Sequence, residues 1–179
     1  LRLGDRLPIV WGSGPLGAVA ATRFRTQCNE NAKVSVVSAP LPEADHNDVM
    51  GLEGGLGPGR ELVLLRDEAG EHDRDGRRIQ AVLAAIDATD PIVRPAAKGP
   101  ALARLARLTA FADFTSTYLG IARGVDPTPI RTLDQVKAAP RLLQYVLAAG
   151  GVVFANSCAP CHGQDGAGRL AHGHDDFHI

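Results

Sequence analysis

The sequence predicts an α/β protein, a three-layer sandwich in which helices cover both faces of a mainly parallel sheet of four to five strands. Two observations point to this fold class. Short apolar runs, each long enough for one strand, alternate with amphipathic segments of helical length. Alternating strands and helices are typical of a parallel sheet covered on both faces. The pattern extends from about residue 5 to residue 139, and a short helical C-terminal tail follows.

The strands are expected where aliphatic and β-branched residues cluster. They are predicted at residues 7–11, 34–38, 61–66 and 91–94, and the run from Glu61 to Arg66 is the clearest. The second strand contains Val34, Val36 and Val37, which suggest burial on both faces. Pro40 and Pro42 end it, because proline cannot donate to a ladder.

Helices are expected over residues 16–31, 77–87, 100–121 and 132–138. Pro15 suits the first turn of the first helix. The apolar spacing predicts the inward-facing residues of the first and third helices. These are Leu16, Val19, Ala20 and Phe24 in the first, and Leu102, Leu105, Thr109 and Ala112 in the third. The charged segment from Asp67 to Asp75 is predicted to be a solvated loop.

Composition excludes several classes of protein. The net charge of −1 and the 45% hydrophobic content fit neither a basic nucleic-acid footprint nor a disordered chain. No run of about 18 apolar residues predicts a membrane span. The first residues are not a signal peptide, and the missing initiator Met suggests a piece of something longer. Three cysteines do not make a disulfide framework, and Cys28 is expected to be a buried thiol.

Two stretches are candidates for chemistry on the connections of the sheet. Glu30 follows the first helix directly before the second strand, where a carboxylate can be desolvated and tuned into a base. The alternative is a solvated residue at a helix end. The turn Gly12-Ser13-Gly14 enters a helix and could bind phosphate through backbone N–H groups. The alternative there is a tight strand-to-helix turn.

Several motifs, in order, resemble one known family. They are Asn29-Glu30-Asn31-Ala32-Lys33, Leu41-Pro42-Glu43-Ala44-Asp45-His46-Asn47-Asp48, Phe111-Ala112-Asp113-Phe114-Thr115-Ser116-Thr117-Tyr118-Leu119 and Arg123-Gly124-Val125-Asp126-Pro127-Thr128-Pro129. Together they resemble the C-terminal half of the bifunctional phosphoglucose/phosphomannose isomerases, which belong to the sugar-isomerase (SIS) fold group. The resemblance covers about residues 8–139 and implies a SIS-like sandwich there.

The resemblance implies aldose–ketose isomerisation of hexose 6-phosphates, glucose or mannose 6-phosphate to fructose 6-phosphate. Glu30 would be the base that moves a proton through an enediol. His46 would open the sugar ring across a dimer contact, and Lys137 would assist ring opening or bind the sugar. Substrate contacts are expected from Gly12, Ser13, Gln27 and Asn29. The implied enzyme is a cytoplasmic homodimer that acts on a sugar phosphate with no cofactor and with neither nucleic acid nor membrane as a partner.

The family carries a complete first SIS subdomain ahead of the matched region, with most phosphate-binding Ser and Thr residues and an arginine near the reacting carbons. That subdomain is not in this sequence. We therefore expect the chain to hold half of an isomerase site and to be nearly inactive alone, because remote phosphate binding also raises kcat. A SIS-type module that binds sugar phosphate without turnover is the alternative.

Residues 140–179 differ in character from residues 1–139 and are expected to form a separate segment. The stretch from Val153 to Gly168 contains Cys158-Ala159-Pro160-Cys161-His162 and resembles the opening helix and attachment site of a c-type cytochrome. Cys158 and Cys161 would bind haem c and His162 would ligate its iron, which makes electron transfer an alternative function. The chain ends 17 residues after His162, so the fragment is incomplete. A zinc site that adds His172 or His174, and a tail without metal, stay open.

Overall fold

The computed structural model describes residues 2–96, 98–138, 152 and 155. The chain divides into two compact units, Leu1–Pro129 and Ile130–Ile179. Among the described residues, the first unit contains the sheet and helices α1 to α3. In the described part of the second unit, α4 spans Arg131–Ala138 and has no buried residue. No helix of the described residues is long and apolar enough to cross a membrane.

A parallel four-stranded sheet forms the middle layer of the first unit. Its strands are β1 (Leu7–Ser13), β2 (Val37–Pro40), β3 (Arg60–Arg66) and β4 (Ile92–Pro95). Their order is β2-β1-β3-β4, and every pairing is parallel. Trp11 of β1 lies opposite Leu64 of β3 on one side and Ala39 of β2 on the other. The predicted α/β class is confirmed.

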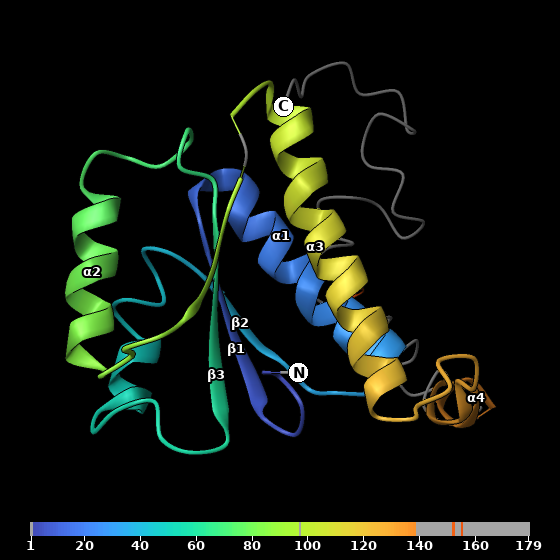
Figure 1. The fold of residues 1–179 in the computed structure, drawn as a ribbon. Helices are drawn as coiled ribbons and strands as arrows, with labels where there is room; N and C mark the ends of the chain where they lie inside the picture. Colours follow the sequence, from blue (N-terminus) through green and yellow to red (C-terminus); the bar gives the residue numbers. More distant parts are fainter. Residues whose placement is uncertain (1, 97, 139–151, 153–154, 156–179) are drawn as a thin grey trace. The chain divides into compact units, whose positions relative to one another are not determined.

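Helices cover both faces of this sheet (Figure 1). α1 (Gly14–Gln27) and α3 (Ala101–Ala122) lie on one face, and α2 (Asp75–Ala85) lies on the other with a 3₁₀ turn, η2 (Asp48–Leu52). Alternating residues of β1 and β3 supply two cores, because successive strand side chains point to opposite faces. Val10, Val63 and Leu65 pack in the core with α1 and α3. Trp11, Leu62 and Leu64 pack in the core with α2.

The second strand differs from the prediction in place and in burial. It begins at Val37, and the preceding residues leave the end of α1 as an extended segment. In the sheet of the described residues it is an edge strand, with β1 as its one neighbour. Val37 is therefore 46% exposed, whereas Val36 is buried. The valine run predicted a strand correctly but could not tell an edge strand from a central one.

The predicted inner faces of two helices are partly wrong. Val19 is 53% exposed and Leu102 is 78% exposed. In α1 the buried face consists of Gly17, Ala20, Ala21 and Phe24, so small residues bring this helix close to its neighbours. In α3 no residue before Leu108 is buried, so the first two turns lie outside the core.

Cys28 is fully buried, as the sequence predicted. Burial raises the pKa of its thiol to about 12. Because the thiolate is the reactive form, we expect Cys28 to resist alkylation in the native protein near pH 8 and to react only after unfolding. Peptide mapping after iodoacetamide treatment with and without urea measures this separately from the other cysteines. Rapid native labelling of Cys28 would contradict the burial.

Candidate functional site

The first helix ends in an unusual turn that carries Glu30. After Gln27 the chain continues as a π-helical turn, η1 (Cys28–Ala32). Lys33 closes the turn in a left-handed conformation with φ of 53°, and its N–H donates to the carbonyl of Cys28. The N–H of Val34 donates to the same carbonyl over 3.2 Å. Turns of this kind are rare and frequently lie at functional sites.

Burial alternates within η1 and leaves Glu30 outside. Cys28 and Ala32 are buried in the core between α1 and α3. Asn29 and Glu30 lie between these two anchors and are exposed. The desolvation expected of a tuned base is therefore not supplied by the described residues of this unit. What η1 does provide is a fixed backbone under an exposed carboxylate.

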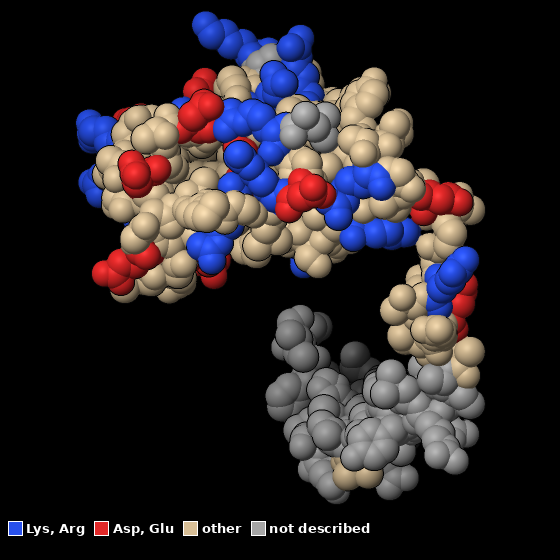
Figure 2. Space-filling view, turned by 60° about the horizontal axis from the view of Figure 1, so that its bottom comes forward, with Lys and Arg blue, Asp and Glu red and all other residues tan. Residues whose placement is uncertain are grey.

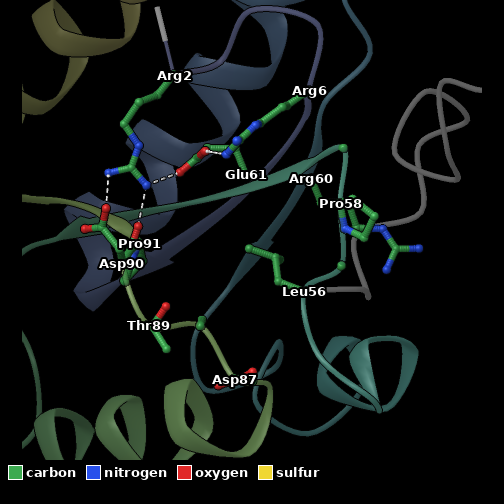
Figure 3. A pocket seen from close by; sticks show the side chains of 13 residues that line it. Arg2, Arg6, Leu56, Pro58, Arg60, Glu61, Asp87, Thr89, Asp90 and Pro91 are labelled. Carbon is green, nitrogen blue, oxygen red and sulfur yellow. Dashed lines mark hydrogen bonds and ion pairs between the residues drawn. The ribbon is translucent and has the colours of Figure 1, made fainter.

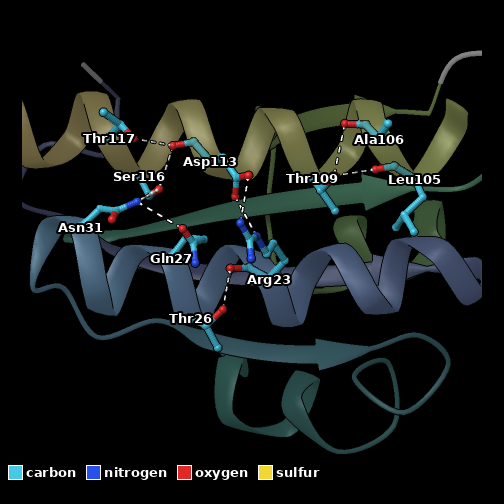
Figure 4. Close-up of polar contacts among 10 residues, drawn as sticks. All are labelled: Arg23, Thr26, Gln27, Asn31, Leu105, Ala106, Thr109, Asp113, Ser116 and Thr117. Carbon is cyan, nitrogen blue, oxygen red and sulfur yellow. Dashed lines mark hydrogen bonds and ion pairs between the residues drawn. The ribbon is translucent and has the colours of Figure 1, made fainter. Parts of the chain in front are cut away.

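The neighbouring helix α3 holds η1 through Asn31 (Figure 4). The side-chain N–H of Asn31 donates to the hydroxyl of Ser116 over 2.9 Å, and a longer contact of 3.4 Å reaches Gln27. The Ser116 hydroxyl in turn donates to the backbone carbonyl of Asp113 over 2.9 Å. Gly120 lies one turn further along α3, and a Cβ there would be 2.5 Å from the carbonyl oxygen of Asn31.

An ion pair and a lysine hydrogen bond lie next to the turn. Arg23 donates two hydrogen bonds to Asp113, of 2.8 and 3.1 Å. The hydrogen bond and the charge of Asp113 raise the pKa of Arg23, and the charge of Glu30 adds to this effect. On the other side, the Lys33 ammonium donates to the carbonyl of Pro127 over 3.1 Å. Arg23 is therefore close enough to Glu30 to feel its charge, and the Arg23 guanidinium is already paired with Asp113.

The predicted site residues fall at two opposite edges of the sheet. Because α1 runs back antiparallel to the strands, η1 lies at the edge where the strands begin. Gln27, Asn29 and Glu30 are together there. His46 follows the end of β2, and Ser13 ends β1 beside Gly12, so these residues lie at the other edge. Glu30 and His46 of one copy are thus not brought together. The resemblance implies a histidine from a second copy, and that stays a prediction.

The loop that carries His46 is held by its neighbours. Asp45 accepts two hydrogen bonds from Arg78, of 2.7 and 2.8 Å, and its side chain is almost fully buried. The side chain of Ala44 is also buried. The backbone N–H of His46 donates to the carbonyl of Glu43, while its imidazole side is exposed. The loop therefore presents His46 to solvent from a supported backbone.

Gly12 and Ser13 have local partners of their own. A Cβ on Gly12 would overlap the carbonyl of Gly17, so glycine allows β1 and α1 to approach closely. The buried Ser13 hydroxyl donates to the carboxylate of Glu71. Arg66 donates two hydrogen bonds to that carboxylate, of 3.0 and 2.6 Å. The Ser13 hydroxyl is therefore already donated to Glu71 and is not free to donate to a phosphate.

The loop after β3 is consequently not the solvated segment that was predicted. Asp67 is 1% exposed and accepts a hydrogen bond of 2.7 Å from Arg104 of α3. The Glu71 side chain is also largely covered. The prediction failed because each carboxylate is neutralised by an arginine that composition alone does not assign to it. Residues 68–70 and 72–74 of the loop are exposed, as predicted.

The carboxyl group of Glu71 makes the folding stability of the protein depend on pH in the acidic range. Burial raises the pKa of its carboxyl, but hydrogen bonds from Arg66 and Ser13 and the charge of Arg66 outweigh burial and hold that pKa below 4.5. A depressed folded pKa stabilises the protein above the unfolded pKa, and this contribution is lost as the pH falls through the folded pKa. We expect wild type to exceed Glu71→Gln in melting temperature at about pH 6, and the difference to shrink toward about pH 3. A difference that stays constant over this range would contradict the role of Glu71.

Lys137 lies in the last turn of α4 and is exposed there. It belongs to the second unit, which is described separately from the first. Its proposed role near the substrate therefore stays a prediction. Cys158, Cys161 and His162 lie outside the described residues, so haem and zinc binding also stay predictions.

A separate pocket of about 450 Å³ lies where β3 and β4 begin, and neither Glu30 nor His46 lines it. Arg2 and Arg6 reach into it toward Glu61, at 2.5 and 2.6 Å (Figure 3). Figure 2 turns the bottom of Figure 1 toward the viewer, and Lys and Arg side chains gather across the middle of that face. Because Arg2 and Arg6 are paired with the buried Glu61, we assign this pocket a structural role.

Sequence reasoning missed the residues that support Glu30. Ser116 was quoted only as part of a motif, although it follows Ala112 by one helical turn and therefore falls on the inward face of α3. A polar residue on an apolar face needs a buried partner, so its position was the available signal. Gly120 gave a similar signal, since glycine inside a long helix costs stability unless another backbone approaches closely.

The fold and the supported turn define a parallel three-layer α/β domain with an exposed acidic residue at the end of its first helix. The model of a family described as the bacterial phospho-glucose isomerase C-terminal SIS domain matches residues 1–139. The chain belongs to this family. That match ends before Cys158 and lends no support to a cytochrome-like tail.

Curated relatives agree with the family. The bifunctional phosphoglucose/phosphomannose isomerase of Aquifex aeolicus is 31% identical over 138 residues, which are 76% of this chain and 43% of the relative. The protein of the same name from Thermoplasma acidophilum is 33% identical over 135 residues, or 75% of this chain and 42% of the relative. The chain thus spans about two fifths of the length of the curated relatives it matches.

Proposed function

We propose that this chain supplies part of the active site of a sugar-phosphate isomerase that converts glucose 6-phosphate or mannose 6-phosphate to fructose 6-phosphate. One observation carries the proposal. The chain belongs to a phosphoglucose isomerase family, and its curated relatives are named for both isomerisations. The turn η1, which carries Glu30, lies inside the matched region. Its fixed backbone supports the proposal chemically, because a general base has to be held in position.

In this proposal Glu30 moves a proton between C1 and C2 of the open-chain sugar through an enediol. A general base needs a position fixed to within hydrogen-bond reach of the proton, and η1 supplies such a fixed backbone. Gln27 and Asn29 lie on the same turn region and would contact the substrate. His46 of a second copy would open the ring, because histidine exchanges protons near neutral pH. Lys137 would bind the sugar or assist ring opening.

The proposal includes an incomplete site. Glu30 is exposed in the described unit and lines none of its three best-formed pockets, and the relatives contain more than twice the matched length. The remaining part of the enzyme would close over Glu30 and anchor the phosphate. Excluding water would then hold the carboxylate within reach of the sugar proton that it removes.

A graft tests this proposal. The matched region of the Aquifex aeolicus relative is replaced by the full chain, and both isomerisations are assayed beside the chain alone. We expect turnover by the graft and almost none by the chain alone. Ordinary turnover by the chain alone would contradict the incomplete site, and a folded but inactive graft would contradict the isomerase proposal.

The exposure of Glu30 favours one second candidate, a module that binds sugar phosphate without turnover. Glucose 6-phosphate would then raise the melting temperature of the chain by mass action while no fructose 6-phosphate forms. An unchanged melting temperature at millimolar ligand would exclude this candidate for the chain alone.

A further inference from the structure

We propose that Ser116 and Gly120 of α3 are positioning residues for Glu30 and act on it through Asn31. This inference rests on the proposed function, because it concerns the residue proposed as the base. In this inference, α3 orients the carboxylate of Glu30, although Glu30 lies in η1 and not in α3. Neither residue is expected to touch the sugar.

The first step is the hydrogen bond that joins the two elements. Asn31 follows Glu30 directly, and its side-chain amide donates to the Ser116 hydroxyl over 2.9 Å (Figure 4). Ser116 is fully buried, and its single hydroxyl proton is donated to the carbonyl of Asp113. The hydroxyl is therefore fixed in orientation. Because its one proton is already donated, it can only accept a hydrogen bond from Asn31, and the Asn31 amide N–H supplies that donor.

The second step is the close approach of the two backbones. Gly120 is buried in α3, and a Cβ at this position would be 2.5 Å from the backbone carbonyl oxygen of Asn31. Real Cβ contacts do not occur at this distance, so a side chain at position 120 would push η1 away from α3. Glycine is required here by contact with the residue next to Glu30, since its helix is otherwise regular.

The third step is that Asn31 and Lys33, which follow Glu30 in the same turn, are tethered, while the contacts of the described residues include none to the Glu30 carboxylate. Lys33 is fixed through Pro127 and through its capping N–H, and Asn31 is fixed through Ser116. Glu30 itself is exposed between these tethers and Asn29. A free carboxylate on a locked backbone is the arrangement that a preorganised base needs, because small displacements of a catalytic group are costly.

The experiment compares Ser116→Ala with Thr117→Ala. Thr117 is a matched control, because its hydroxyl donates to the same carbonyl of Asp113 over 2.8 Å but does not reach η1. In the isolated full chain, we expect Ser116→Ala to speed amide exchange of Lys33 and Val34 by roughly two- to tenfold, the effect of one hydrogen bond. Thr117→Ala should leave these two amides unchanged.

The effect on catalysis is measured as kcat and KM of the graft. We expect Ser116→Ala to lower kcat by about tenfold or more while KM changes little, because orientation of the base matters in the transition state. Asn31→Ala should have the same effect, and the double variant should be no worse than either, since one bond is broken in all three. Thr117→Ala should keep both constants.

Two results would overturn the inference. One is unchanged exchange at Lys33 and Val34 in Ser116→Ala. The other is a Ser116→Ala graft with unaltered kcat, or with losses that add to those of Asn31→Ala. A graft that is inactive with the unaltered chain instead contradicts the proposed function, and the exchange measurement still decides whether Ser116 fixes the turn.

Discussion

Replacing Glu30 by glutamine is expected to lower kcat of the graft by roughly 10²–10⁴-fold for both substrates, the range that a positioned general base contributes. Glutamine keeps the size and the exposure of the side chain but cannot accept the proton. KM should change little, because the carboxylate acts on C–H bonds and not on the phosphate. Steady-state kinetics with glucose 6-phosphate and mannose 6-phosphate measure this.

Glu53→Gln is the matched control for this substitution. Glu53 is also exposed and lies in a turn after η2, and no role in the site is assigned to it. It should leave kcat and KM unchanged in the graft. If Glu30→Gln retains more than about a tenth of the activity, another group acts as the base and the mechanism proposed for this chain is wrong.

Replacing Gly12 by alanine is expected to destabilise the chain by about 3 kcal/mol or more, at the upper end of overpacking effects. The added Cβ would collide with the backbone at Gly17 and Ala18, and backbone cannot rotate away as a flexible side chain can. β1 would have to separate from α1 where the central strand enters its helix. Urea unfolding of the full chain measures the loss.

Gly51→Ala serves as the control for this effect. A Cβ at Gly51 meets nothing within 4 Å. Its stability should therefore stay within about 0.5 kcal/mol of wild type. A stable Gly12→Ala protein that folds normally but no longer binds sugar phosphate would contradict the packing role and support the substrate contact predicted from the sequence.

The sequence predicted a strand correctly where consecutive residues were all apolar. The run from Glu61 to Arg66 is apolar between its ends, and it forms β3, one of the two inner strands. The valines around position 36 could not distinguish an edge strand, because strand propensity does not report how many neighbours a strand has. Val19 was misplaced because helical periodicity gives relative angles, whereas the close packing of Gly17, Ala20 and Ala21 decides which side of α1 faces inward. Leu102 was misplaced because burial in α3 begins only at Leu108.

Glu30 was identified from a sequence motif, but the residues that hold its turn in place were not. Glu30 was singled out from its position and its resemblance to a family. The contacts of Asn31 with Ser116 and Gly120 join residues more than 80 positions apart, and a single sequence does not reveal such pairs. The same holds for Asp67 and Glu71, whose arginine partners turn a charged loop into a partly buried one.

Exchange of hydrogen with solvent tests the central assignment most directly. The graft is incubated with fructose 6-phosphate in D₂O, and deuterium at C2 of the aldose products is measured by NMR. A base at position 30 that passes a proton through an enediol should introduce deuterium at C2 in wild type and almost none in Glu30→Gln. Equal deuterium uptake by both proteins would show that proton transfer does not depend on Glu30.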